Sequence, residues 1–285
     1  MSATHRSAIG SRLLIHAALV VICLVTLYPV LWVVGMALSP SQGVPTGVWP
    51  LPAHPTLHNF TDLMTAADGA GRLLFWRQLA NSLIVATLTT VVGLVLSVTA
   101  AYAMSRWSFP GRRQGLMALL ATQMFPATMM SIPLYAILDR LGLLNSVSGL
   151  VLVYATTAIP FCVWMLKGYF DTIPKDLEEA AMLDGASPGQ IFLKVVLPLA
   201  RPALAVTALF SFMTAWNEFI LAATFLDDAA RFTLPVALQR LVGEYRTEWG
   251  TFAAGALLVS APVMVVFFAL QKHLVGGLTA GGVKG

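Results

Sequence analysis

The chain has 285 residues, of which 58% are hydrophobic and 11% are charged. A soluble domain carries nearer ~25% charged residues, so this composition excludes an ordinary soluble domain and indicates a polytopic membrane protein. The formal net charge is +4, but the basic residues are spread among many segments, which favours orientation in a bilayer over nucleic-acid binding. Cys23 and Cys162 both lie inside apolar runs, so neither a disulfide framework nor a thiolate metal site is indicated.

The first apolar run covers residues 13–38 and follows a short basic N-terminus. It is longer than the apolar region of a signal peptide and lacks a small-residue cleavage site, so we expect a retained first span. Residues 39–79 are rich in proline and glycine at their start. We interpret them as an external loop that rests on the membrane interface, with a short amphipathic helix around residues 60–64 and 73–76.

Five more apolar runs are each long enough for the ~20 residues that a bilayer requires. They cover residues 79–105, 116–138, 147–170, 199–225 and 252–274. Six spans place both termini on one side of the membrane, and about two thirds of the 17 Lys and Arg residues fall on that side, as expected for cytoplasmic termini. We therefore predict an all-α membrane protein with six transmembrane helices.

Prolines occur within several of the expected spans, where freed carbonyls must be satisfied by neighbouring helices or a wet cavity. They are Pro29, Pro126, Pro133, Pro160 and Pro262. Together they favour a moving bundle around a passage. The alternative for any one of them is that proline is simply commoner in membrane helices.

The most polar long segment between two strongly apolar ones covers residues 174–197 and predicts two short helices that meet at a turn. Pro174 can open the first helix, and Gly185 supplies a left-handed stop. Ser187 and Gln190 have the spacing of a capping box, which predicts a second helix that continues into the next apolar run. Three carboxylates suit the positive end of the first helix: Asp176, Glu178 and Glu179.

This elbow, residues 174–197, has no lipid-facing role because its carboxylates cannot enter hydrocarbon. We therefore expect it to lie in water and to be gripped by a soluble partner. The alternative is a solvated acidic connector without a partner.

The elbow also resembles the EAA motif of binding-protein-dependent ABC importer permeases. The matching residues are Glu179, Ala180, Ala181, Gly185, Val195, Leu197 and Pro198, with Val195 at a position where the family usually has Ile. The resemblance implies a type I ABC importer permease fold in which the elbow is the coupling helix, seated in a cleft of a partner ATPase. The implied coupling residues are Glu178, Glu179, Ala180, Ala181, Asp184, Gly185, Leu197 and Pro198.

The resemblance covers residues 81–285 and is close to the G-type permeases of maltose/maltodextrin importers. It is carried by residues 101–103, 109–111, 123–127, 167–170 and 278–285 in addition to the elbow. It implies an F-type permease partner, an ATPase dimer that uses ATP and Mg²⁺, and a periplasmic sugar-binding protein. It also implies that the tail, with Gly281, Gly282 and Lys284, reaches between the ATPase subunits, and that residues 227–250 form a scoop toward the binding protein.

The implied organisation has an N-terminal span and loop (1–78), a permease core (79–275) and a cytoplasmic tail (276–285). From composition alone, the glycine-rich tail is a frayed end that does not form a helix by itself. Within residues 227–250, Pro235 and apolar residues at helical spacing predict a short amphipathic helix. A solvated connector is the alternative reading of that segment.

The sequence lacks the motifs expected of an ATPase, a serine hydrolase or a histidine metal site. No Gly-Lys dipeptide occurs, which excludes a P-loop and with it ATP hydrolysis of that kind. Residues 185–189 match G-x-S-x-G, but Pro188 lacks the backbone N–H that a nucleophile elbow requires after its serine. The five histidines include one close pair without a third ligand nearby, so we predict no catalytic residue, no metal site and no enzyme activity.

Glu218 is the one acidic residue well inside an expected span. An ionisable group there costs roughly 2.5 kcal/mol or more unless it faces a polar cavity or partner. Trp216 beside it suits stacking on a sugar ring, and Asn217 and Glu218 suit hydrogen bonds to hydroxyls, so the three are candidates for the substrate pathway. The alternative is a helix-packing cluster that touches no substrate.

We therefore expect a permease of a maltose/maltodextrin-type importer that works by alternating access in the bacterial inner membrane. A second hypothesis is the same class of transporter for another oligosaccharide or glycerol phosphate. A third is a membrane-embedded enzyme or a standalone channel. Co-purification of an ATPase distinguishes the first two from the third.

Overall fold

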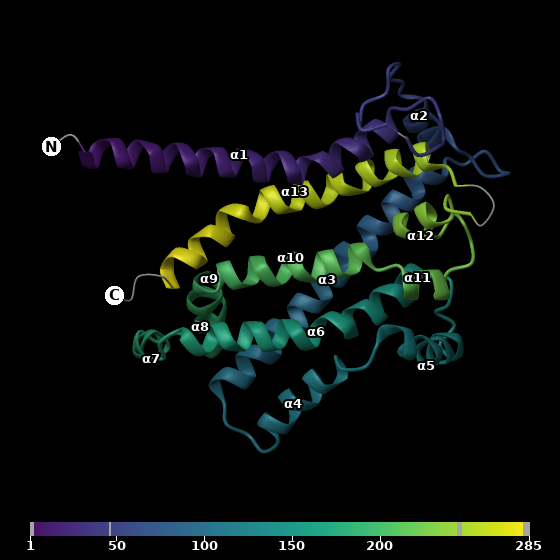
Figure 1. The fold of residues 1–285 in the computed structure, drawn as a ribbon. Helices are drawn as coiled ribbons and strands as arrows, with labels where there is room; N and C mark the ends of the chain where they lie inside the picture. Colours follow the sequence, from purple (N-terminus) through teal and green to yellow (C-terminus); the bar gives the residue numbers. More distant parts are fainter. Residues whose placement is uncertain (1–2, 46, 244–246, 282–285) are drawn as a thin grey trace. The chain divides into compact units, whose positions relative to one another are not determined.

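A computed structural model describes residues 3–45, 47–243 and 247–281 (Figure 1). Among these residues the regular elements are helices, and β-pairing is limited to two isolated bridges. The prediction of an all-α chain is confirmed. Contacts between Cα atoms group the chain into two compact units, Met1–Leu73 with Leu238–Ser260 and Leu74–Ala237 with Ala261–Gly285. The division by role into 1–78, 79–275 and 276–285 stays a prediction.

Four helices are long and apolar enough to cross a membrane, and two further spans are possible if each of two bent helix pairs counts as one. The four are α1 (Ala3–Ala37), α3 (Leu74–Arg106), α6 (Val147–Thr172) and α13 (Trp249–Gly281). The bent pairs correspond to the third and fifth spans expected from sequence. The described residues thus hold between four and six spans.

The core of the second unit is formed by α3, α6 and α10 (Arg201–Asn217), which pack against one another. Small and polar side chains of α3 and α10 are buried in this core: Thr89, Ser97, Thr207 and Ser211 are each 0% exposed. A Cβ at Gly93 of α3 would lie 3.5 Å from Ser211 Oγ. Small residues allow close backbone approach, which is how membrane helices gain packing energy without a hydrophobic driving force.

The third expected span, residues 116–138, is not a continuous helix. It consists of α4 (Arg112–Thr122) and α5 (Ala127–Arg140), which are bent by 101° relative to each other. Pro126 has an extended backbone and directly precedes α5. Proline disfavours helical backbone in the residue before it and removes a helix hydrogen bond, so the chain turns there. The other four span prolines lie inside helices.

The fifth expected span, residues 199–225, is also interrupted. Helix α10 ends at Asn217, Glu218 has an extended backbone, and α11 covers Ile220–Phe225. The elbow's second helix does not continue straight into this span either, because Pro188–Leu199 and Arg201–Asn217 are bent by 78°. Ala200, with ψ of 2°, lies at that bend between Pro198 and Pro202, neither of which can donate a helix hydrogen bond.

The first unit contains α1, α2 (His58–Thr65) and the beginning of α13. Ala37, Ala253 and Ala254 form its small core. The buried amide of Asn59 donates to the backbone oxygens of Ala37 (3.0 Å) and Ser39 (2.8 Å), and so fixes the loop that follows α1. Helix α2 confirms the short helix expected around residues 60–64. The part expected at residues 73–76 is wrong, because residues 74–76 begin the long helix α3.

Two elements near the C-terminus bear on the sequence predictions. Helix α12 (Leu234–Gln239) confirms the short helix expected after Asp227. The expectation that the tail is non-helical is wrong up to Gly281, because α13 extends to that residue. Extending an existing helix needs no new nucleation, so even a glycine-rich sequence can continue it. Gly282 and Lys284 lie outside the described residues.

Candidate functional site: the helical elbow

The turn of the elbow follows α7 (Asp176–Leu183) and depends on Gly185, whose φ is +83°. The N–H of Gly185 donates to Met182 O (3.0 Å), and the N–H of Ala186 donates to Ala181 O (3.0 Å). These two bonds are a Schellman motif, which satisfies carbonyls at the end of a helix and requires a left-handed residue at this position. The predicted stop at Gly185 is confirmed.

The second arm of the elbow begins with the predicted capping box. Ser187 N donates to Gln190 Oε1 (2.8 Å), Gln190 N donates to Ser187 Oγ (3.4 Å), and Pro188 occupies the first position of α8 (Pro188–Ile191). The chain then widens into the π-helix η1 (Phe192–Val196) before α9 (Leu197–Leu199). This π-helix was not predicted from the sequence. The available signal was Pro198, which lacks an N–H to continue the hydrogen-bond pattern of an α-helix.

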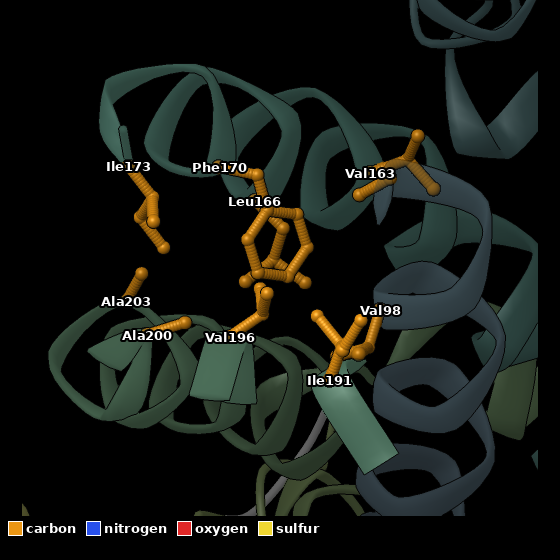
Figure 2. Packing of buried hydrophobic residues seen from close by; sticks show 10 residues of the cluster. Val98, Val163, Leu166, Phe170, Ile173, Ile191, Val196, Ala200 and Ala203 are labelled. Atoms are coloured by element: carbon orange, nitrogen blue, oxygen red, sulfur yellow. The ribbon is translucent and has the colours of Figure 1, made fainter. Parts of the chain in front are cut away.

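The second arm is anchored by an apolar cluster to α3 and α6. Figure 2 shows side chains from α6, from the second arm and from α3 pointing toward one another. Phe170, Leu166 and Val196 are fully buried in it. The labelled members are Val98, Val163, Leu166, Phe170, Ile173, Ile191, Val196, Ala200 and Ala203. Burial of this apolar surface fixes the direction in which the second arm leaves the helix core.

The first arm presents an exposed surface that is both acidic and apolar. Glu179, Ala180, Asp184 and Gly185 are exposed, and Leu183 is 90% exposed. Leu177, Met182 and Leu193 are further apolar side chains of the elbow that are exposed within this chain. Large exposed apolar side chains close to charged ones are a feature of protein interaction sites.

The predicted coupling residues therefore divide into two groups. Glu179, Ala180, Asp184 and Gly185 lie on the exposed surface. The others pack inward to different degrees: Ala181, Leu197 and Pro198 are half-buried, and Ala181 and Leu197 touch the apolar cluster.

The expectation that the elbow's carboxylates all lie in water is wrong for Glu178. Its side chain is 7% exposed and pairs with the guanidinium of Arg106, at the end of α3. Tyr102 Oη also donates to Glu178 Oε2 (2.8 Å). A buried carboxylate is tolerated here because a cation and a hydroxyl satisfy it. Neither Arg106 nor Tyr102 was predicted as a partner of Glu178, although Tyr102 belongs to residues 101–103, one of the stretches that carry the resemblance.

The three candidates for the substrate pathway lie at the break after α10, and the structure separates their roles. Trp216 is 1% exposed and stacks on Phe212, with ring centroids 5.6 Å apart. Asn217 is exposed and donates to Met213 O on its own helix (2.9 Å). Glu218 accepts hydrogen bonds from the backbone N–H groups of Leu221 and Ala222. Trp216 is thus a packing residue in this conformation, and Glu218 caps α11.

A cavity of about 700 Å³ lies beside the bend between α4 and α5. Its polar lining includes Gln123, Thr156 and Thr157, and Gln123 Nε2 donates to Thr157 O (2.7 Å). Phe125 of the bend and Leu221 of α11 contribute apolar surface. None of these residues was predicted as a site residue, because the sequence analysis treated residues 116–138 as a continuous span.

Comparison with known proteins decides the family. The family model described as "Binding-protein-dependent transport system inner membrane component" matches residues 93–279, a range that contains the whole elbow. The chain belongs to this family. The resemblance drawn from the EAA motif is confirmed.

Relatives match over most of the chain. It is 38% identical over 261 residues to the trehalose transport system permease protein SugB of Mycobacterium tuberculosis, covering 91% of this chain and 93% of that protein. It is 44% identical over 219 residues to the maltose/maltodextrin transport system permease protein MalG of Escherichia coli, covering 75% of this chain and 73% of the relative.

The fold also matches a solved structure. A chain from a bacterial ABC transporter involved in the import of the acidic polysaccharide alginate superimposes with a TM-score of 0.76 at 27% identity, covering 95% of this chain and 98% of the other. The prediction of an ABC importer permease fold is confirmed.

Proposed function

We propose that this chain is a permease subunit of an ATP-driven carbohydrate importer of the bacterial inner membrane, and that its elbow is the surface on which the ATPase docks. The observation that carries the proposal is the exposed surface of Glu179, Asp184 and Leu183 at the first arm of the elbow, while buried apolar side chains anchor the second arm to α3 and α6. A surface that is exposed but rigidly supported is suited to receiving force from a partner.

The proposed mechanism is alternating access. Closure of the ATPase dimer on ATP and Mg²⁺ moves the elbow, and the elbow moves the helices to which it is anchored. The cavity then opens to the periplasm and receives solute from the binding protein. After hydrolysis it opens inward. Coupling is mechanical, so Glu179 and Gly185 act through the shape of the docking surface.

The proposed partners are an F-type permease, an ATPase dimer, a periplasmic sugar-binding protein and the surrounding lipid. Dependence on a binding protein is part of the family's description. The bias of Lys and Arg residues supports cytoplasmic termini and a cytoplasmic elbow. In this arrangement the C-terminal tail reaches the ATPase subunits and residues 227–250 face the binding protein.

The proposed substrate is a maltose- or maltodextrin-type sugar that passes along the cavity beside Gln123 and Phe125. Support for a carbohydrate comes from relatives whose names specify trehalose and maltose/maltodextrin transport. Because these relatives carry different sugars at similar identity, another oligosaccharide is the second candidate. Glycerol phosphate is a third solute that the same architecture accommodates.

Reconstitution tests this proposal. The permease is purified with its co-expressed partners, placed in proteoliposomes, and supplied with binding protein, ATP and one radiolabelled solute at a time. Maltose, maltotriose, trehalose and glycerol 3-phosphate form the panel. We expect ATP-dependent uptake of maltose or maltotriose. Uptake of another panel member alone would change the substrate, and uptake that needs neither ATP nor an ATPase would favour a channel.

A further inference from the structure

The buried pair of Arg106 and Glu178 joins three elements of the chain at one point. Arg106 Nε donates to Glu178 Oε1 at the start of α7. Its other nitrogens donate to Phe170 O (2.9 Å) and Ile173 O (3.1 Å) at the end of α6. Phe170 O also accepts from the N–H of Ile173 (3.1 Å) in the last turn of α6, and a cation is favoured at the negative end of a helix. One guanidinium from α3 therefore holds the end of α6 and the beginning of α7.

The network extends beyond this pair. Arg106 Nη1 also donates to Ser105 Oγ (2.9 Å), and Ser105 Oγ donates to Asp171 Oδ1 (2.7 Å). Lys167 Nζ donates to Asp171 Oδ2 (2.5 Å). The ends of α3 and α6 are thereby fixed to each other by charged groups as well as by the apolar cluster.

The two arms of the elbow are attached in different ways. The second arm is held through the buried apolar side chains of Figure 2. The backbone of α7 lies mainly beside α8 and η1, which belong to that second arm. Among the described residues, direct polar attachment of α7 to α3 depends on Glu178, and Arg106 extends this attachment to the end of α6. Glu178 faces inward from the same short helix that exposes Glu179.

We infer that Arg106 and Glu178 are positioning residues that form the joint through which movement of α7 reaches α3 and α6. The inference rests on the proposed docking of an ATPase on the elbow. Under this inference the two adjacent glutamates have separate roles. Glu179 faces the ATPase, and Glu178 transmits the displacement of α7 to the membrane-spanning helices. A buried ion pair with several hydrogen bonds is suited to transmitting this movement, because separating the two residues would leave each of them buried and unpaired.

The test separates docking from transmission. Arg106→Gln, Glu178→Gln and the double variant are prepared in the assembled transporter, and three quantities are measured in proteoliposomes: ATPase retained, ATP hydrolysed and solute taken up. Arg113→Gln is the matched control, since Arg113 is an exposed arginine near the same end of α3. Tyr102→Phe is a milder variant that removes one hydrogen bond to Glu178 and keeps the ion pair.

We expect the single variants to retain the ATPase and its hydrolysis, while uptake per ATP hydrolysed falls by about tenfold, a typical size for a coupling between sites. The double variant should lose less than the product of the two single losses, because the two residues act as one pair. Tyr102→Phe should lower uptake per ATP hydrolysed by a smaller factor. If Arg106→Gln does not accumulate in the membrane, the result for Tyr102→Phe tests the inference in its place. Arg113→Gln should match the wild type.

Unchanged uptake per ATP in Glu178→Gln and Tyr102→Phe would overturn the inference while leaving ATPase docking intact. Loss of ATPase binding in Glu178→Gln alone would also overturn it, because Glu178 would then belong to the docking surface. Failure of the proposed function looks different: the wild-type permease itself would retain no ATPase.

Discussion

Tyr154 donates its hydroxyl hydrogen to Glu218 Oε2 across 2.5 Å, and this bond connects α6 to the break between α10 and α11. The same carboxylate accepts from Leu221 N (2.8 Å) and Ala222 N (3.0 Å) in the first turn of α11. Negative charge is favoured at a helix N-terminus. Glu218 thus supports α11, whose Leu221 lines the cavity.

Glu218→Gln should lower the stability of the permease by about 1–3 kcal/mol, because an amide nitrogen cannot accept and leaves a buried donor unsatisfied. Thermal unfolding of the assembled transporter in detergent measures the change. Asn217→Ala is the control, since Asn217 is exposed and bonds only to its own helix among the contacts described. A raised KM for uptake with unchanged unfolding temperature would instead identify Glu218 as a direct solute ligand.

Trp216→Phe should leave the KM for uptake unchanged. The indole ring is buried against Phe212, and its Nε1 has no hydrogen-bond partner in the described part of the structure. Phenylalanine removes that unsatisfied donor and keeps most of the stacking. Uptake measured over a range of solute concentrations checks this. A several-fold rise in KM would show that the ring reaches the solute in another conformation.

Gly185 allows the docking surface and the turn to be tested separately. An added Cβ would meet no atom of this chain within 4 Å, so bulk at this position does not clash internally. Asn tolerates the left-handed conformation, whereas most other residues pay about 1–2 kcal/mol. Gly185→Asn should therefore keep most uptake, and Gly185→Trp should abolish uptake while the subunit still inserts into the membrane. Normal uptake in the Trp variant contradicts docking at this turn.

Gly93 tests the close approach of α3 and α10. A methyl group fits there at ordinary contact distance from Ser211 Oγ, but a longer side chain forces the helices apart. Gly93→Ala should leave the unfolding temperature near that of the wild type, and Gly93→Leu should cost about 1–3 kcal/mol. Equal stability of the two variants would show that the helices do not pack tightly at this point.

Local features of the elbow were predictable from sequence because their causes lie within a few residues. Gly185 needs only its own backbone freedom, and Ser187 reaches Gln190 three residues away. Both were expected and both are present. The same holds for the short helix after Asp227, which begins at a Leu-Pro pair.

Features that depend on distant residues were not predictable. Glu178 and Arg106 are 72 residues apart, and sequence gave no sign that the carboxylate would be buried with a cation. The break at Pro126 has a local cause in that proline, but the break at Glu218 interrupts an apolar run whose composition is that of a continuous helix. At Glu218 the break is stabilised by Tyr154, 64 residues away, so the tertiary contact determines where the helix ends.

The most direct test of docking on the elbow is a crosslink from a single cysteine. Cys23 and Cys162 are first replaced by serine or alanine, and Leu183→Cys, at a site 90% exposed, is compared with Ile191→Cys, at a site 1% exposed on the same elbow. A cysteine-reactive photo-crosslinker is attached in the assembled transporter. We expect Leu183→Cys to form an adduct with the ATPase and Ile191→Cys to form none. A transporter that contains the ATPase but yields no adduct from Leu183→Cys would contradict docking at the elbow.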